Sequence, residues 1–244
     1  MFLDGDHTIA FAHRGFARGG DENSLAAFQR AVDAGARYLE TDVRVTRDGV
    51  PVAFHDATLD RVTDGRGRID QLPWEIVRRA RIAGREPVAL LADVLTSWPG
   101  VRVNIDVKSR TVIPSLVTVI RRTAAHERVC IAAFSTSRVA AVRTALGPSV
   151  CTAYGPAAVM SLRAVGVARG RGARCVQAPA RVAGRPFITA RFVAAATARG
   201  LPVHAYTVND ESEMHRLLDL GVRGLMTDRF DVLRTALTER GEWS

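Results

Sequence analysis

Short apolar runs, of the kind that form buried strands, alternate along the chain with segments whose apolar residues recur every three or four positions. The first pattern favours strands and the second favours amphipathic helices. Eight strands are predicted, the second with a continuation over 50–54, at 8–12, 38–45, 101–107, 129–133, 150–153, 174–177, 202–207 and 224–226. Helices are predicted at 24–34, 90–98, 113–126, 136–146, 157–168, 189–199, 211–220 and 231–238. The chain therefore repeats one strand–helix unit from end to end.

Local signals mark the ends of several predicted helices. Side chains that can cap a helix N-terminus stand at Ser24, Thr136, Thr189 and Asp210. Glycines stand where helices are expected to end, at Gly35, Gly147, Gly200 and Gly221. Residues 55–87 depart from the alternation, with a polar turn over 64–68 and a short extra helix predicted over 73–82. We interpret them as a loop excursion after the second strand.

The number and length of these units match a known architecture. Eight strands, each followed by a helix, within 244 residues predict a (β/α)8 (TIM) barrel of the α/β class. A doubly wound open sheet is the alternative, but it favours a GxGxxG turn after the first strand, which the sequence lacks. Because no linker or low-complexity tract interrupts the pattern, we expect one domain over residues 1–244, with 55–87 as an insertion.

Composition indicates the class of protein and the compartment in which the chain works. Hydrophobic residues make up 47% and charged residues 24%, which are ordinary values for a globular protein. No apolar run approaches the ~18 residues of a membrane-spanning helix, and the acidic N-terminus does not resemble a secretory signal. Cys130, Cys151 and Cys175 lie far apart without metal-ligand spacing, which predicts reduced, buried thiols. We therefore expect a cytoplasmic protein without a transmembrane segment, a disulfide or a zinc site.

The basic charge of the chain has a compositional explanation. A net charge of +9 would normally indicate nucleic acid as a partner. However, Lys108 is the single lysine among 34 Lys and Arg residues, and the arginines are spread along the chain with few aromatic residues between them. That pattern offers no platform on which bases could stack. We attribute the arginines to compositional bias and expect no nucleic-acid partner.

Carboxylates gather at the predicted C-terminal ends of two strands, where barrels of this type hold their reacting groups. Glu40 and Asp42 stand two residues apart and so share a face of the second strand, and Asp106 on the third strand can approach the same point. Three converging carboxylates repel each other and raise each other's pKa unless a cation lies between them. An all-oxygen shell favours Mg²⁺ or Ca²⁺ over zinc. We therefore expect these residues to bind one divalent cation.

Basic side chains surround this acidic group. His13 and His55 each follow a predicted strand, and two imidazoles beside carboxylates can move the protons that cleavage of a P–O bond requires. Arg14 carries a planar fork that matches two phosphate oxygens. Lys108 stands two residues beyond Asp106 and is a compact cation that fits beside a metal and an anion. We expect the two histidines to act as acid and base, and the two cations to bind phosphate.

Short motifs occur in a fixed order along nearly the whole chain. They are AHRG at 12–15, ENS at 22–24, ETDV at 40–43, TRDG at 46–49, HD at 55–56, LDRVT at 59–63, NIDVK at 104–108, YTVN at 206–209 and GVRGLMTD at 221–228. This set resembles the glycerophosphodiester phosphodiesterase family. The resemblance implies a (β/α)8 barrel that uses a divalent metal to hydrolyse glycerophosphodiesters to glycerol 3-phosphate and an alcohol. It also implies that the substrate's glycerol 2-hydroxyl attacks phosphorus before water opens the cyclic phosphate.

Matched position by position, the resemblance implies the same site residues. The metal ligands would be Glu40, Asp42 and Asp106, the acid–base pair His13 and His55, and the phosphate-binding residues Arg14 and Lys108.

Three positions depart from the family pattern. Asp106 stands where Glu is usual, and its side chain, shorter by one methylene, would lengthen the metal contact or admit a water. Tyr206 stands where Trp is usual, and we expect it to bind substrate on the alcohol side with a smaller wall. Ser24 replaces Thr and still supplies a capping hydroxyl.

Two other functions stay open. A lysophospholipase D or a cyclising phospholipase on the same barrel would need an apolar groove, whereas the predicted loops are rich in Arg and Gly. A non-catalytic barrel that binds polyanions through its arginines gives no reason for two histidines beside three acids. We therefore favour metal-dependent hydrolysis of a small-molecule glycerophosphodiester. The sequence indicates neither the head group nor the oligomeric state.

Overall fold

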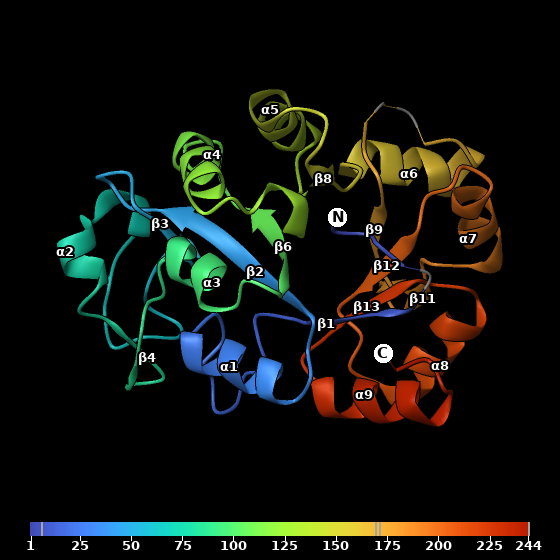
Figure 1. The fold of residues 1–244 in the computed structure, drawn as a ribbon, viewed down its shortest axis with the longest axis horizontal. Helices are drawn as coiled ribbons and strands as arrows, with labels where there is room; N and C mark the ends of the chain where they lie inside the picture. The colour runs from blue at the N-terminus through green and yellow to red at the C-terminus, as the bar shows by residue number, and fades with distance from the viewer. Residues whose placement is uncertain (6, 169, 171, 244) are drawn as a thin grey trace.

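Eight parallel strands form the wall of a barrel in the computed structural model, which describes residues 1–244 except 6, 169, 171 and 244. They are hydrogen bonded in the order β8-β7-β6-β2-β1-β13-β12-β9 (Figure 1). Their bounds are β1 (Ile9–Ala12), β2 (Tyr38–Val45), β6 (Arg102–Val107), β7 (Val129–Ala132), β8 (Cys151–Thr152), β9 (Val176–Pro179), β12 (Val203–Tyr206) and β13 (Gly224–Thr227).

Backbone hydrogen bonds join the two ends of this strand order. Ala153, just after β8, pairs in parallel with Cys175, just before β9. The N–H of Tyr154 donates to the carbonyl of Cys175 at 3.0 Å, and the N–H of Arg174 donates to the carbonyl of Thr152 at 2.9 Å. The sheet therefore closes on itself. The predicted (β/α)8 barrel is confirmed, and the open-sheet alternative is wrong.

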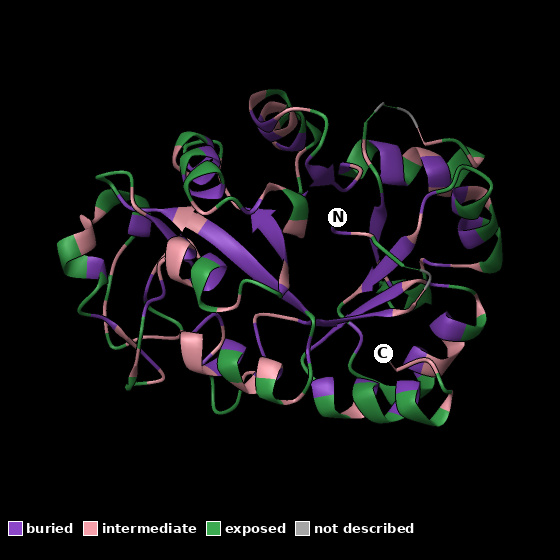
Figure 2. Cartoon of the chain, viewed as in Figure 1, coloured by how far each residue is buried: buried purple, intermediate pink, exposed green. Residues whose placement is uncertain are grey.

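A helix follows each of the eight strands and packs on the outside of the barrel. The bounds are α1 (Leu25–Asp33), α3 (Leu91–Ser97), α4 (Ile113–Arg122), α5 (Thr136–Leu146), α6 (Pro156–Val165), α7 (Ala190–Thr197), α8 (Glu211–Asp219) and α9 (Phe230–Glu239). Buried residues line the strands and the helix faces toward them, and exposed residues cover the outer faces (Figure 2). None of the helices in the described part of the chain is long and apolar enough to cross a membrane.

The excursion after β2 differs from its prediction. The continuation predicted over 50–54 is β3 (Pro51–Ala53), which returns antiparallel to β2. Residues 55–87 then contain η1 (Ile69–Gln71), α2 (Trp74–Val77), β4 (Arg81–Ile82) and β5 (Glu86–Pro87). The helix predicted over 73–82 is wrong beyond Val77, because β4 and β5 form an antiparallel hairpin. The turn of this hairpin holds Ala83 at φ 50° and Gly84 at φ 72°, a left-handed conformation that no helix continues.

One predicted cap is also wrong. The hydroxyl of Ser135, not that of Thr136, accepts the capping hydrogen bond of α5, from the N–H of Arg138. Ser135 is extended at φ −153° and ψ 117°, the conformation that a capping residue adopts, whereas Thr136 is already helical. Three other predicted caps accept such bonds and are confirmed: Ser24, Thr189 and Asp210.

Several element boundaries shift as well. The helix predicted over 157–168 ends at Val165, because Gly166 caps it in a left-handed conformation at φ 72°. The helix predicted over 113–126 ends at Arg122, because Ala124 adopts a left-handed φ of 50°. The short turn η2 (His126–Arg128) follows it. The strand predicted over 174–177 lies at Val176–Pro179, since its pairing with β12 begins at Val176.

Rings fill the interior of the barrel beneath its mouth. His204 is fully buried, neither of its ring nitrogens has a hydrogen-bond partner, and burial lowers its pKa to about 3. Its ring centroid lies 5.2 Å from that of Phe11. A Cβ on Gly224 would lie 2.8 Å from Cδ2 of His204 and 2.9 Å from Cε2 of Phe11. The glycine therefore leaves room for a neutral, apolar pair of rings.

The three cysteines are free and buried, as predicted, but they do not lie apart. Their Sγ atoms all lie within 4.8 Å of one another. Closure of the barrel brings them together from separate strands, and spacing along the sequence carries no signal of this cluster.

Candidate active site

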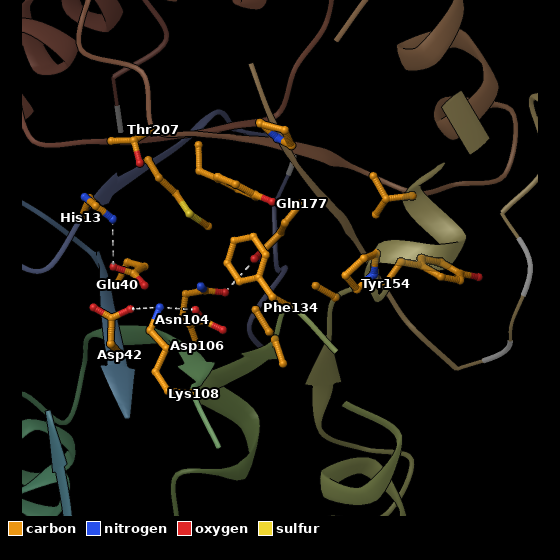
Figure 3. Close-up of a pocket in the computed structure, with 18 of the residues that line it drawn as sticks. His13, Glu40, Asp42, Asn104, Asp106, Lys108, Phe134, Tyr154, Gln177 and Thr207 are labelled. Atoms are coloured by element: carbon orange, nitrogen blue, oxygen red, sulfur yellow. Dashed lines mark hydrogen bonds and ion pairs between the residues drawn. The ribbon is translucent and has the colours of Figure 1, made fainter. Parts of the chain in front are cut away.

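A pocket of about 340 Å³ opens at the C-terminal ends of the strands, where this fold holds its reacting groups. All eight predicted site residues line it: His13, Arg14, Glu40, Asp42, His55, Asp106, Lys108 and Tyr206. Figure 3 shows His13 and the acids at one end of the pocket and Tyr154 toward the other. The structure thus brings the predicted residues together, while their roles remain predictions.

Strand register explains why the three acids converge. β2 and β6 are parallel neighbours in which Glu40 lies opposite Asn104 and Asp42 lies opposite Asp106. Because alternate residues of a strand share a face, all three carboxylates point to the same side of the sheet. All three are buried. Asn104 is held beneath them by Gln177, whose Nε2 donates to Asn104 Oδ1 at 2.7 Å.

Lys108 bridges two of these acids. Its Nζ lies 2.7 Å from Asp42 Oδ1 and 2.6 Å from Asp106 Oδ2, and 13% of its side chain is exposed. Burial opposes the charge, but the two carboxylates raise the pKa of Lys108 above its usual value. Lys108 is therefore a charged ammonium held between two strands.

The three acids differ in how far their surroundings favour the charged form. Burial, reinforced by Asp42, raises the pKa of Glu40 to about 7. Burial likewise raises the pKa of Asp106, and its Oδ1 is a buried oxygen without a hydrogen-bond partner. The pKa of Asp42 is lowered, because Lys108 and Arg14 outweigh the effect of burial. A cation beside Glu40 and Asp106 would offset the burial that raises these two pKa values.

The donor set fits a hard divalent ion, because all three side chains offer carboxylate oxygens. The three do not yet form a tight shell. Two groups of His, Cys, Asp and Glu in the described part of the chain hold their ligand atoms within 4.8 Å of one another, and this trio is neither of them. Lys108 lies between Asp42 and Asp106 instead.

His13 is held by an acid that the sequence analysis gave no role. Its Nδ1 lies 2.6 Å from Asp228 Oδ1, and its Nε2 lies 3.9 Å from Glu40 Oε2. Asn209 supports Asp228, with its Nδ2 donating to Asp228 Oδ2 at 2.8 Å. Burial lowers the pKa of His13, but Asp228 and Glu40 raise it by more. Asp228 and Asn209 both belong to motifs of the family resemblance, which was the signal available.

His55 is held in the same way. Its Nδ1 lies 2.6 Å from Asp56 Oδ1, and Arg61 Nε donates to the other Asp56 oxygen at 2.5 Å. Arg61 also donates to Glu22, which anchors the excursion loop to the first strand's loop. Because a carboxylate holds Nδ1 in each histidine, Nε2 is the atom free to exchange a proton at the pocket.

Arg14 is more constrained than a free phosphate fork. Its Nη1 donates to Glu22 at 2.8 Å, and its Nε lies 3.2 Å from Asp42 Oδ2 without hydrogen-bond geometry. Its φ of 53° turns its N–H toward Glu40 Oε2, at 3.1 Å. The next residue is a glycine, because a Cβ on Gly15 would lie 2.8 Å from the carbonyl carbon of Ala27. The arginine therefore also positions the acids.

An apolar wall lines the rest of the pocket, and the sequence analysis missed it. Tyr206 packs edge-to-face on Phe134, with ring centroids 5.9 Å apart, and burial raises the pKa of Tyr206 to about 12. Beyond them the lining is apolar or aromatic: Tyr154, Pro156, Val159, Met160, Pro179, Val182 and Phe187. Phe134, Met160 and Val182 are exposed by 65%, 56% and 51%. The segments that follow β7, β8 and β9 therefore carry apolar side chains as well as Arg and Gly.

The glycerophosphoryl diester phosphodiesterase family model matches residues 13–232. A protein of Mycobacterium tuberculosis described as a probable glycerophosphodiester phosphodiesterase is 42% identical over 251 residues, covering 99% of this chain and 95% of that protein. A glycerophosphodiester phosphodiesterase from Agrobacterium tumefaciens has the same fold, with a TM-score of 0.79 at 22% identity over 95% of this chain and 99% of that one. So does an Oleispira antarctica phosphodiesterase solved with its product sn-glycerol-3-phosphate, with a TM-score of 0.81 at 23% identity over 95% and 97%. The chain belongs to the glycerophosphoryl diester phosphodiesterase family and is a phosphoric diester hydrolase.

Proposed function

We propose that this chain hydrolyses glycerophosphodiesters to glycerol 3-phosphate and an alcohol, with two histidines as acid and base. The observation that carries the proposal is a pair of His–carboxylate contacts, His13–Asp228 and His55–Asp56, in a pocket with a buried acidic cluster. Two imidazoles with fixed Nδ1 atoms suit a reaction in which one proton is taken and another is given. Membership of the family supports the same reaction.

Glu40, Asp42 and Asp106 would hold one divalent cation, Mg²⁺ or Ca²⁺. When bound, such a cation polarises a phosphate oxygen as a Lewis acid. Support comes from the all-oxygen donor set, the raised pKa of Glu40 and the unpartnered Oδ1 of Asp106. Lys108 and Arg14 would hold the phosphate charge, and Tyr206 would line the alcohol side.

The histidines then carry both protons through two steps. In the first, one Nε2 takes the proton of the glycerol 2-hydroxyl while that oxygen bonds to phosphorus, and the other Nε2 gives a proton to the departing alcohol. In the second, water attacks the cyclic phosphate and the two histidines exchange roles. Both end in their starting protonation states, so each cycle consumes one water. Asp228 and Asp56 orient the rings.

Turnover of glycerophosphocholine tests this function. Purified protein should release choline and glycerol 3-phosphate in equal amounts with Mg²⁺ or Ca²⁺, lose turnover in EDTA, and regain it when the ion is restored. His126→Ala, on η2 and outside the pocket, is a matched control that should behave as wild type. Turnover that EDTA leaves unchanged would overturn the metal site. Polyphosphate binding without any turnover would support the polyanion-binding barrel instead.

The apolar wall favours a second candidate, a lysophospholipase D activity at the same site. Phe134, Met160 and Val182 reach the pocket from the segment after β7, from α6 and from the segment after β9, and an acyl chain in the pocket would contact them. The protein should then release choline from 1-acyl lysophosphatidylcholine. Val182→Asp, on the exposed hairpin β10 (Arg181–Val182) and β11 (Arg185–Pro186), should reduce that activity and spare glycerophosphocholine. Equal losses on both substrates would count against an acyl-binding wall.

We also propose a cytoplasmic location, which the three free, buried cysteines support.

A further inference from the structure

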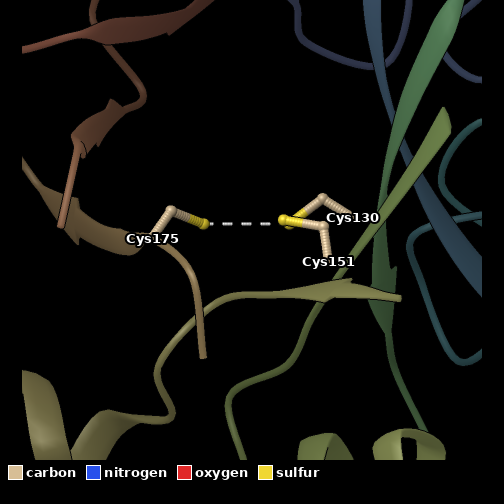
Figure 4. A group of neighbouring side chains, drawn as sticks. All are labelled: Cys130, Cys151 and Cys175. Atoms are coloured by element: carbon tan, nitrogen blue, oxygen red, sulfur yellow. Dashed lines mark hydrogen bonds between the residues drawn. The ribbon is translucent and has the colours of Figure 1, made fainter. Parts of the chain in front are cut away.

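Three cysteine sulfurs converge inside the barrel, away from the acids and histidines. Cys130 in β7 is the register partner of Cys151 in β8, and Cys175 stands just before β9 (Figure 4). Their Sγ atoms lie within 4.8 Å of one another, and those of Cys130 and Cys175 are 3.8 Å apart. β7, β8 and β9 are neighbours around the barrel. Pairing of β7 with β8 brings Cys130 beside Cys151, and closure of the barrel between β8 and β9 brings Cys175 to them.

The cluster lies one layer beneath the floor of the active-site pocket. Ala132 and Ala153, two residues beyond Cys130 and Cys151 on the same strand faces, line that pocket. The neighbours of the cysteines are apolar: Phe2, Ile9, Phe11, Tyr38 and Met226. The proposed phosphodiester reaction does not use these thiols.

The spacing suits a single ion bound by sulfur. Three sulfurs that each lie about 2.3 Å from one ion in their plane are separated by about 4.0 Å, close to the 3.8 Å between Cys130 and Cys175. Zinc normally closes a tetrahedron with a fourth ligand. In the described part of the chain, the cysteine cluster offers three ligand atoms, and all three are cysteine sulfurs. Thiolate-only, three-coordinate surroundings select soft cations of the Cu(I) kind.

An ion there would join the strands where the barrel is least connected. β8 has two residues, and in the described chain a single bridge, Ala153 to Cys175, pairs its end with the start of β9. Cys151 and Cys175 lie on opposite sides of this seam. Cys151 also borders a depression of about 1080 Å³ beside the N-terminal segment, lined by Met1, Phe2 and Arg174, so one edge of the cluster lies next to solvent-open space.

We propose that Cys130, Cys151 and Cys175 bind one soft, thiophilic cation of the Cu(I) class, which clips the β8–β9 seam of the barrel. Binding displaces the thiol protons to solvent and changes no oxidation state. The inference does not depend on the proposed phosphodiesterase activity, because its readouts are stoichiometry and thermal stability.

The experiment titrates the reduced full-length protein with Cu(I), supplied under anaerobic conditions from a chromophoric chelator. One equivalent should leave the chelator, with a sulfur-to-copper charge-transfer band in the ultraviolet. At a free ion concentration about 100-fold above Kd, Tm should rise by about 5–10 °C. Cys175→Ala should remove the band and the rise in Tm. Met214→Leu, which removes a buried sulfur elsewhere in the core, should keep both.

Circular dichroism of each ion-free variant shows whether it folds, and Cys151→Ser provides a second, more conservative thiol removal. Binding that survives both cysteine substitutions would overturn the site. Failure of wild type to compete for Cu(I), or a preference for Zn²⁺ over Cu(I) in a parallel titration, would overturn the assigned ion class.

Discussion

Replacing Lys108 with Met removes the ammonium that joins Asp42 to Asp106, at 2.7 and 2.6 Å. Losing one preorganised electrostatic contact in an active site costs about 2.7–4 kcal/mol of transition-state stabilisation. Lys108 keeps 13% of its side chain exposed and Arg14 still faces Asp42, so we expect about 2–4 kcal/mol. That corresponds to a loss of about 30- to 1,000-fold in kcat/KM. The assay is glycerophosphocholine hydrolysis at saturating metal.

Lys108→Arg is the discriminating variant, because it keeps the charge. A guanidinium is wider than an ammonium and would pair with Asp106 as a two-pronged fork instead of standing between two strands. We therefore expect Lys108→Arg to lose activity by a factor similar to Lys108→Met. Near-native kcat/KM in the arginine variant would refute the reasoning, because it would show that this position does not need a lysine. Arginine already supplies the other 33 of the 34 Lys and Arg residues.

Three further substitutions test separate parts of the account. Asp42→Asn should weaken metal affinity and lower activity in a way that excess metal partly restores, measured by metal titration of turnover. Burial lowers the pKa of His13 but Asp228 raises it above 6.5 overall, so their contact stabilises the fold below about pH 6.5 and fades as pH rises through the raised pKa. Asp228→Asn should therefore lower urea stability more at about pH 5.5 than at about pH 9. Gly224→Ala should cost about 1–3 kcal/mol, because its Cβ would lie 2.8 Å from the ring of His204, and thermal unfolding measures this.

The barrel and the convergence of the acids were predictable because both follow from periodicity. Residues two apart on a strand share a face whatever the fold around them, so Glu40 and Asp42 had to project together. The position of Asp106 needed one more assumption, that consecutive strands pair, and the register of β2 with β6 confirms it.

Contacts between distant loops were not predictable in the same way. The apolar wall joins Phe134 after β7, Met160 in α6 and Val182 in β10, and no periodic pattern relates them. Pairing of Arg14 with Glu22 depends on the left-handed backbone conformation of Arg14, which an arginine in the sequence does not predict. The cysteine cluster depends on closure of the whole ring, so it exists only at the level of the tertiary fold.

The most direct test of the central claim is kcat on glycerophosphocholine for His13→Ala, His55→Ala and the double variant, each checked for folding by circular dichroism. Each single variant should lose about 10²- to 10⁴-fold, as general acid–base groups do. The double variant should lose less than the product of the two factors, because both histidines serve one proton cycle. A folded variant of either histidine that keeps near-native kcat would contradict the account.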